Sequence, residues 1–240
     1  MKMKLGILNS LDSQEREINW QGSAVSIYIR LFETVQAPFE YVGYEVAQGE
    51  LPESPDACDA YLITGSPTGV YDDEPWIMPL SDFIRACYRQ NKRLVGICFG
   101  HQILAEALGG HVEKSEKGKG LGLKTFAINA TKPWMSEPSS QCALYFVHQD
   151  QVIDLPPEAE LLGGNAFCPN ALYTINNRVL GIQGHPEFTH DLMEKILTAH
   201  DKQTDPEVHA TAVASLNNGM PDNQRMATWI VNFLTADILH

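Results

Sequence analysis

Three residues that lie far apart in the chain have the side chains that nucleophilic catalysis needs. Cys98 lies in the run RLVGICFGHQ, and His185 and Glu187 lie in the run GIQGHPEF. A thiolate is a strong nucleophile, and a histidine can act as its base and then as an acid toward the leaving group. A carboxylate can hold that histidine in one tautomer and stabilise its charged form. These residues predict acyl-transfer chemistry at Cys98 if the fold brings them together.

Cys98 stands between Gly96 and Gly100, at the point where a predicted apolar strand at residues 93–97 turns into a predicted helix at residues 99–108. Glycine lets a backbone turn tightly and lets neighbouring chain approach closely. We expect the thiol to stand out at the tip of this turn, where a helix N-terminus favours a negative charge. The alternative is a cysteine that only fills core space, which is the commoner role of a lone cysteine.

A glycine-rich loop, LITGSPTGV at residues 62–70, follows another predicted strand. It lacks the lysine of a phosphate-binding loop and the spacing of a dinucleotide fingerprint, so it does not predict a nucleotide site. The tetrahedral intermediate of acyl transfer needs preorganised N–H donors instead. The backbone amides of Ser66 in this loop and of Phe99, directly after Cys98, are the candidate donors.

Alternating strand-like and helix-like runs in the first half of the chain are the elements that must position these residues. Such alternation predicts a parallel sheet with helices on both faces. Ligands bind beyond the carboxyl ends of the strands in sheets of this kind, which is where Cys98 and the loop at residues 65–69 fall. The expected strands span residues 5–8, 39–46, 60–64 and 93–97, and the expected helices span residues 24–35, 76–90 and 99–108.

The second half of the chain changes character. Short β-like runs separated by Pro and Gly predict antiparallel strands added to an edge of the sheet, among them residues 123–128, 143–147, 171–175 and 179–182. The pattern after Glu187 is helical, at residues 191–200, 206–216 and 222–239, with Asp205 as an N-cap before a first-turn proline. We therefore expect a catalytic domain at residues 1–190 and a helical C-terminal extension at residues 191–240 that packs on it.

Composition narrows the class of protein. The chain has 240 residues, of which 44% are apolar, and 17 basic against 30 acidic residues give a net charge of −13. This charge opposes binding to nucleic acid or to an anionic membrane surface. The five cysteines are widely spaced without a CxxC pair, which argues against a disulfide framework or a zinc site and for a reducing, cytoplasmic location. The four cysteines other than Cys98 are expected to pack in the core.

The segments GICFGHQ, HPE and GSPTGVYD together closely resemble the class I, triad-type glutamine amidotransferases, especially the glutaminase domain of GMP synthetase and its free-standing relatives. The resemblance covers residues 5–190 and implies an α/β, flavodoxin-like, three-layer fold with a mostly parallel sheet. It implies transfer of a γ-glutamyl group to Cys98 as a thioester, release of ammonia, and hydrolysis of the thioester. It also implies His185 as base and acid, Glu187 as the residue that orients it, and the N–H groups of Ser66 and Phe99 as the oxyanion hole.

Substrate-binding positions follow from the same resemblance and are Gly65, Gln102, Val147 and His148. Gln102 lies one helical turn after Cys98, and the segment YFVHQDQV at residues 145–152 matches a strand whose backbone meets the substrate's α-amino and α-carboxylate groups. Val147 and Gln149 stand where GMP synthetase has a serine and a glycine, so the substrate pocket departs from that enzyme. His148 and Asp150 have an equal claim to a purely structural role.

Three functions remain open from the sequence. The first is a glutamine-hydrolysing subunit that supplies ammonia to a separate synthase, and the second is a free-standing hydrolase of γ-glutamyl peptides or conjugates, of the kind that plant γ-glutamyl peptidases represent. The third is a non-catalytic, amidotransferase-like regulatory protein, against which the complete triad argues. We expect a small-molecule γ-glutamyl substrate, no cofactor, no metal, and no nucleic-acid or membrane partner.

Overall fold

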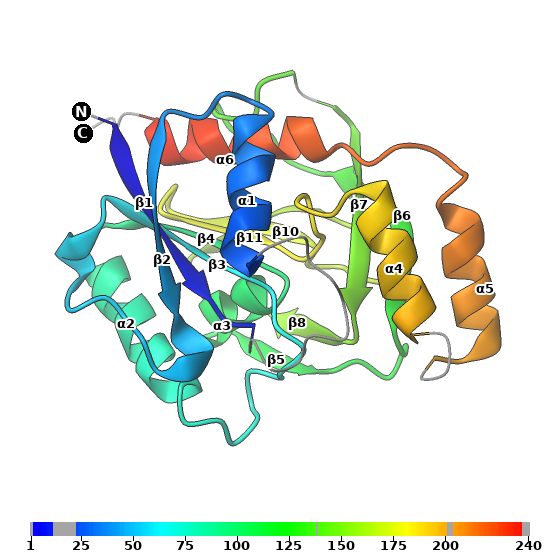
Figure 1. Cartoon of the computed structure of the whole chain (residues 1–240), viewed down its shortest axis with the longest axis horizontal. Coiled ribbons are helices and arrows are strands. Elements are labelled where there is room, and N and C mark those ends of the chain that lie inside the picture. Colours follow the sequence, from blue (N-terminus) through cyan, green and yellow to red (C-terminus); the bar gives the residue numbers. More distant parts are fainter. Residues whose placement is uncertain (1, 12–22, 138, 201–203, 237–240) are drawn as a thin grey trace.

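The chain folds around one large sheet with helices on both faces (Figure 1), and the computed structural model describes residues 2–11, 23–137, 139–200 and 204–236. The sheet has nine strands in the order β2-β1-β3-β4-β11-β10-β9-β6-β7, and β5 and β8 form a separate two-stranded sheet. The strands from β2 to β11 in this order pair in parallel, and those from β11 to β7 pair antiparallel. This mostly parallel sheet with an antiparallel extension is the expected fold class, which is confirmed.

The strands are β1 (Met3–Asn9), β2 (Phe39–Glu45), β3 (Ala60–Ile63), β4 (Arg93–Ile97), β5 (His111–Lys114), β6 (Gly120–Ile128), β7 (Gln141–His148), β8 (Asp150–Asp154), β9 (Ala159–Gly164), β10 (Leu172–Ile175) and β11 (Val179–Ile182). The α-helices are α1 (Ala24–Glu33), α2 (Ile77–Arg89), α3 (Phe99–Ala107), α4 (His190–His200), α5 (Pro206–Ser215) and α6 (Asn223–Thr235).

Two apolar clusters lie on opposite faces of the sheet and explain why its central strands are continuous apolar runs. One cluster joins Tyr28 and Phe32 of α1 to Trp229 of α6, and the other contains Ile84 of α2 and Ile103 of α3. The parallel strands β3 and β11 are buried at every position because helices cover both sides. The site described below therefore lies at the ends of strands that are buried on both faces.

The C-terminal helices α4, α5 and α6 pack on earlier elements of the chain. Leu197 of α4 and Ala212 of α5 share a third apolar cluster with Leu121 of β6. Gly122 lets α5 approach β6 closely, because a Cβ at this position would lie 2.9 Å from the Cα of Ala212. The α6 helix packs against α1 and fills the same cluster as the central strands. Residues 237–239 of the expected last helix lie outside the described residues.

The ends of the expected strands and helices in the parallel half lie within two residues of the observed ends. The expected cap of α5 is confirmed, because Asp205 accepts hydrogen bonds from the amides of Glu207 and Val208. The strands β5, β8 and β9 were not singled out, since β5 buries one of its four residues and β9 ends in two glycines. The other four cysteines are buried in the core, which confirms their expected packing role.

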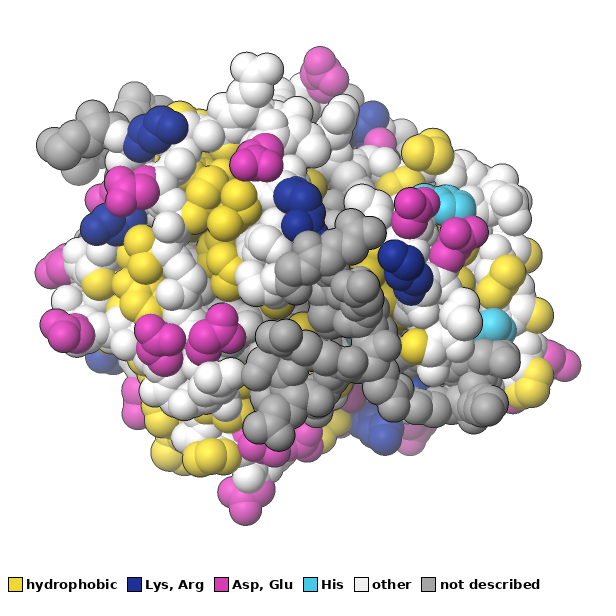
Figure 2. All heavy atoms as spheres, viewed as in Figure 1, with side chains coloured by type: hydrophobic (Ala, Val, Ile, Leu, Met, Phe, Trp, Pro, Cys, Tyr) yellow, Lys and Arg dark blue, Asp and Glu magenta, His cyan; other side chains and the backbone are white. Residues whose placement is uncertain are grey.

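Charged side chains of both signs are dispersed over the face of the molecule seen in Figure 2. Within the described part of the chain, no helix combines the length and apolar character needed to cross a bilayer.

Candidate active site

Three adjacent parallel strands end at the same edge of the sheet, and each is followed by one part of the expected site. The loop containing Gly65 follows β3, Cys98 follows β4, and His185 lies three residues after β11. The strands are in register, because Ile63 pairs with Gly96 and Ile97 pairs with Ile182. The amide of Cys98 also donates to the carbonyl oxygen of Ile182 at 2.9 Å. Parallel pairing thus brings together segments that are about 30 and 90 residues apart in the sequence.

The turn at Cys98 is as tight as its two glycines predict. Cys98 has φ 53° and ψ −105° and immediately precedes the first residue of α3. A Cβ on Gly96 would lie 2.2 Å from the carbonyl oxygen of Gly100, and a Cβ on Gly100 would lie 2.2 Å from that of Ile63. Any larger residue at position 96 or 100 would force α3 away from β4 or β3. The glycines therefore allow a backbone conformation that non-glycine residues rarely adopt.

The expectation that the thiol stands out from the surface is wrong. Cys98 is 5% exposed and belongs to the central apolar cluster. Its sulfur lies 3.9 Å from the carbonyl oxygen of Val147, the residue before the last position of β7. The elbow points inward because β7 and the segment after β11 close over it, and the amide of His185 is itself fixed to the carbonyl oxygen of Tyr145 of β7 at 2.8 Å.

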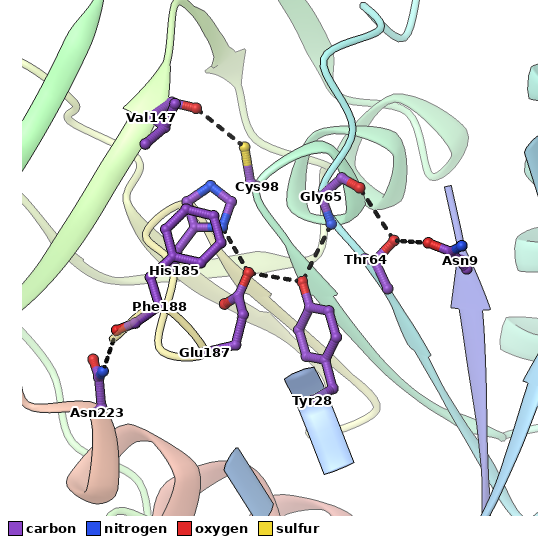
Figure 3. A network of polar contacts seen from close by, with 10 residues as sticks. All are labelled: Asn9, Tyr28, Thr64, Gly65, Cys98, Val147, His185, Glu187, Phe188 and Asn223. Carbon is purple, nitrogen blue, oxygen red and sulfur yellow. Dashed lines mark hydrogen bonds and ion pairs between the residues drawn. The ribbon is translucent and has the colours of Figure 1, made fainter. Parts of the chain in front are cut away.

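His185 and Glu187 form a buried pair. The Nδ1 atom of His185 lies 2.7 Å from Oε1 of Glu187, and the two side chains are 6% and 2% exposed. Burial lowers the pKa of His185, but the negative charges of Glu187 and Cys98 outweigh it and raise the pKa to about 10. The ring lies between the thiol and the carboxylate in Figure 3. A histidine held between a thiol and a carboxylate in this way is placed to act as the base of a cysteine nucleophile.

The imidazole of His185 is also stacked against an aromatic side chain. Phe188 stacks on it with ring centroids 4.1 Å apart and an interplanar angle of 6°. The side-chain amide of Asn223, at the start of α6, donates to the carbonyl oxygen of Phe188 at 2.7 Å (Figure 3). The C-terminal helix therefore contacts the segment that carries the histidine. Neither Phe188 nor Asn223 is predicted from the sequence to take part in the site.

The loop after β3 borders both Cys98 and His185. A Cβ on Gly65 would lie 3.1 Å from Cε1 of His185 and 3.6 Å from Cβ of Cys98. Gly65 thus lets the backbone pass directly beside the two reactive side chains. The amide of Ser66 comes next in this loop, and Phe99 begins α3, where the first N–H groups of a helix have no intrahelical acceptor. Both expected oxyanion donors therefore belong to segments that adjoin Cys98.

Gln102 is buried rather than an exposed helix residue. Its Nε2 donates to the carbonyl oxygen of Asp150 at 2.8 Å and to Oε1 of Gln183 at 3.1 Å. The side-chain nitrogen is thus engaged with protein acceptors in this structure. Gln102 links α3, β8 and the segment after β11, so at the least it holds the walls of the site in place.

His148 is 8% exposed and packs against the rings of Phe146 and Phe167. Burial and then the nearby charge of His185 lower the pKa of His148 to about 3, so its ring is neutral. Neither ring nitrogen has a hydrogen-bond partner among the described residues. A buried polar group without a partner is costly, and a ligand is one way to satisfy it.

One group of side chains in the described part of the chain has the spacing of metal ligands, namely His190, Asp191 and Glu194 at the start of α4. The two carboxylates are exposed, and such groups are common on protein surfaces without an ion. The arrangement around Cys98 needs only a thiol, a base and hydrogen-bond donors.

Comparison with known proteins gives one family. Residues 18–201 match the family model described as class-I glutamine amidotransferase. Gamma-glutamyl peptidase 5 of Arabidopsis thaliana is 32% identical over 80% of this chain and 80% of that protein. A Saccharomyces cerevisiae protein named as a candidate glutamine amidotransferase is 32% identical over 84% of this chain and 85% of that protein. The crystal structure of a glutamine amidotransferase from Thermotoga maritima has the same fold, with a TM-score of 0.75, 18% identity, and coverage of 98% of this chain and all of that one.

Proposed function

Because this chain belongs to the class-I glutamine amidotransferase family, we propose that it hydrolyses γ-glutamyl amide bonds through a thioester on Cys98. The observation that carries the proposal is the alignment of three groups at the ends of β4 and β11. Cys98 sits in a strained turn, His185 lies against it, and Glu187 holds the far side of the imidazole at 2.7 Å. This order of nucleophile, base and orienting carboxylate is the triad arrangement of acyl-transfer enzymes.

The reaction takes two steps. The Cys98 thiolate attacks the γ-carbonyl carbon, and the oxygen that becomes negative is stabilised by the N–H groups of Ser66 and Phe99. His185 gives its Nε2 proton to the leaving nitrogen, the C–N bond breaks, and ammonia or an amine departs from a γ-glutamyl thioester. A water molecule then attacks the thioester, His185 accepts a proton from that water, and the C–S bond breaks. Glutamate leaves and the thiolate is restored, so water and the substrate are the only reactants.

Two classes of leaving group fit this mechanism. We favour γ-glutamyl peptides or conjugates, because the similarity to the Arabidopsis peptidase extends over four fifths of both proteins. The yeast relative named as a candidate amidotransferase supports the second candidate, hydrolysis of glutamine with ammonia as product. In that case the acceptor of the ammonia would be a separate synthase.

The experiment uses the purified full chain with two substrates at equal concentration. Glutamate and ammonia are measured after incubation with glutamine or with γ-glutamylcysteine, and intact mass is measured after treatment with 6-diazo-5-oxo-norleucine, a glutamine-like diazo ketone. We expect one covalent adduct, loss of adduct and of turnover in Cys98→Ala, and faster glutamate release from the peptide. Cys142→Ala is the matched control, since Cys142 is a buried thiol at the opposite end of β7 from Val147, near Asp222, and its variant should keep both properties.

Faster turnover of glutamine than of the peptide would overturn the substrate assignment and leave the thioester mechanism in place. A wild-type protein that forms no adduct and releases no glutamate from either compound would refute the enzyme proposal. A Cys98→Ala variant with undiminished turnover would refute the mechanism.

A further inference from the structure

A tyrosine of α1 reaches the triad from the face of the sheet opposite to α3. Tyr28 is 3% exposed, and its hydroxyl oxygen lies 2.9 Å from Oε1 of Glu187 and 3.4 Å from the backbone nitrogen of Gly65. Glu187 and Gly65 follow different strands, β11 and β3. Figure 3 shows the hydroxyl placed between the two. One side chain therefore contacts both the carboxylate that orients His185 and the loop that precedes Ser66.

The direction of these hydrogen bonds is fixed by chemistry. The amide of Gly65 can only donate, so the oxygen of Tyr28 accepts there and its own proton is directed to Glu187. Burial, and then the charge of Glu187, raise the pKa of Tyr28 well above its usual range, so the hydroxyl keeps this proton. A hydrogen bond from a neutral hydroxyl to a carboxylate is among the stronger kinds.

Glu187 depends on this contact for its orientation. Its Oε1 receives both the imidazole of His185 and the hydroxyl of Tyr28, whereas its Oε2 has no hydrogen-bond partner among the described residues. Without Tyr28, one hydrogen bond alone would hold the carboxylate, and that bond would come from the ring it is meant to orient. Rotation of the carboxylate would then cost little and would weaken its hold on His185.

We propose that Tyr28 is a positioning residue that fixes the Glu187 carboxylate against His185 and ties it to the Gly65 backbone beside the oxyanion loop. The proposal rests on the proposed thioester chemistry at Cys98. The positions of the base and of the oxyanion donors then depend on each other, because one hydroxyl links the segment that carries His185 to the loop that carries Ser66. Gly65 also lies beside the nucleophile, because a Cβ at position 65 would lie 3.6 Å from Cβ of Cys98.

The test removes only the hydroxyl, with Tyr28→Phe in the full chain. We expect kcat to fall by about tenfold and KM to change by less than about threefold, since a hydrogen bond to a charged group is lost while the substrate pocket is kept. We also expect the alkaline limb of kcat/KM to move about 0.5 to 1 pH unit lower, because a loosely held Glu187 stabilises the imidazolium of His185 less. The charged or titratable groups that act on His185 are Glu187, Cys98 and His148.

Tyr61→Phe is the matched control. Tyr61 is fully buried, its hydroxyl accepts from the amide of Cys58 at 3.1 Å, and it donates to the carbonyl oxygen of Pro55 at 3.0 Å. Tyr61→Phe therefore removes the same kind of group as Tyr28→Phe. The hydroxyl of Tyr61, however, contacts residues that precede β3, whereas the candidate site follows β3. This variant should show the same change in melting temperature as Tyr28→Phe or a larger one, with an unchanged pH profile.

A double-mutant cycle separates positioning from a general structural effect. The rate at which iodoacetamide alkylates Cys98 is measured for wild type, Tyr28→Phe, Glu187→Ala and the double variant, so the readout needs no substrate. If Tyr28 acts through Glu187, its effect disappears in the Glu187→Ala background. Equal effects in both backgrounds, or an unmoved alkaline limb in Tyr28→Phe, would overturn the proposal. If Glu187→Ala does not fold, the pH profile of Tyr28→Phe decides.

The two proposals fail in different ways. An inactive wild-type protein would refute the proposed function, whereas an active wild-type protein with an unaltered Tyr28→Phe variant would refute the role of Tyr28 alone.

Discussion

The parallel and antiparallel halves of the sheet contribute different kinds of group to the candidate site. The parallel strands β3, β4 and β11 are followed by Gly65, Cys98 and the segment of His185, and hydrogen bonds hold Glu187 against His185 and Tyr28. The antiparallel strand β7 supplies the carbonyl oxygen of Val147 and the ring of His148, which packs against the rings of Phe146 and Phe167. In the proposed mechanism, the parallel half holds the groups that move protons, and the antiparallel half forms one wall of the site.

The difference follows from strand direction. Parallel neighbours all end at one edge, so short loops from each of them meet at one point. Antiparallel neighbours end at opposite edges, so only alternate strands can deliver a residue to the same place. Changes in the parallel half should therefore alter kcat, and changes in the antiparallel half should alter KM.

The largest expected effect is that of Glu187→Gln in the parallel half. Gln keeps the shape of the side chain but removes the charge that stabilises the imidazolium, so we expect kcat to fall by roughly 10² to 10⁴-fold. The charged form of His185 is the form that protonates the leaving group, so wild-type kcat/KM should decline as pH rises through about 10, the raised pKa of His185. Loss of the carboxylate lowers this pKa, and the alkaline limb should move to lower pH.

The control for this variant is Glu106→Gln. Glu106 lies in α3 and accepts a hydrogen bond from the amide of Val112 at 2.9 Å, so it is a glutamate with a structural contact outside the triad. Its variant should keep the wild-type kcat and pH profile. An effect of Glu187→Gln on KM alone would contradict the division between the two halves.

A smaller effect is expected from His148→Phe in the antiparallel half. Phe keeps the ring between Phe146 and Phe167 but removes the two nitrogens that have no partner in the described structure. If these nitrogens contact the substrate, KM rises by about 3- to 10-fold, the value of one neutral hydrogen bond, while kcat stays within about twofold. Steady-state kinetics on the better substrate measure both. An unchanged KM would assign His148 a structural role only.

The smallest effect is expected from Asn223→Ala. This variant tests whether the C-terminal helix α6 helps to position His185 at the end of the parallel half. This change removes the hydrogen bond to the carbonyl oxygen of Phe188 and loosens the ring stacked on His185. We expect kcat to fall by about two- to fivefold, because one neutral hydrogen bond is lost and its effect reaches His185 only through Phe188. Asn232→Ala is the control on the same helix, since its side chain contacts Trp134 and Ser136 instead. Equal kinetics for both variants would mean that α6 only packs.

The parallel half was the more predictable from the sequence. Its central strands β3, β4 and β11 are short apolar runs, and Gly96 and Gly100 mark the turn at Cys98 by residue type alone. The strands β5 and β8 were harder, because they pair with each other outside the main sheet and carry charged residues such as Glu113 and Asp150. Their pattern does not alternate as a half-buried strand should.

The burial of Cys98 and the role of Tyr28 depend on contacts between distant segments, which a single sequence does not encode locally. The turn at Cys98 predicts a protruding thiol only if nothing closes over it, and β7 does so from about 50 positions away. Tyr28 looks like one more apolar residue of an amphipathic helix, among Ile27, Leu31 and Phe32. The one available signal was a hydroxyl on the buried face of that helix.

The backbone at Cys98 has a consequence for attempts to engineer this protein. A non-glycine residue at φ 53° and ψ −105° costs of order 1–3 kcal/mol, and glycine would remove most of that cost. Cys98→Gly would also leave a gap in the central apolar cluster and would remove the proposed nucleophile, so lost packing opposes the gain in backbone freedom. A selection for heat resistance that includes position 98 therefore needs an activity step alongside it.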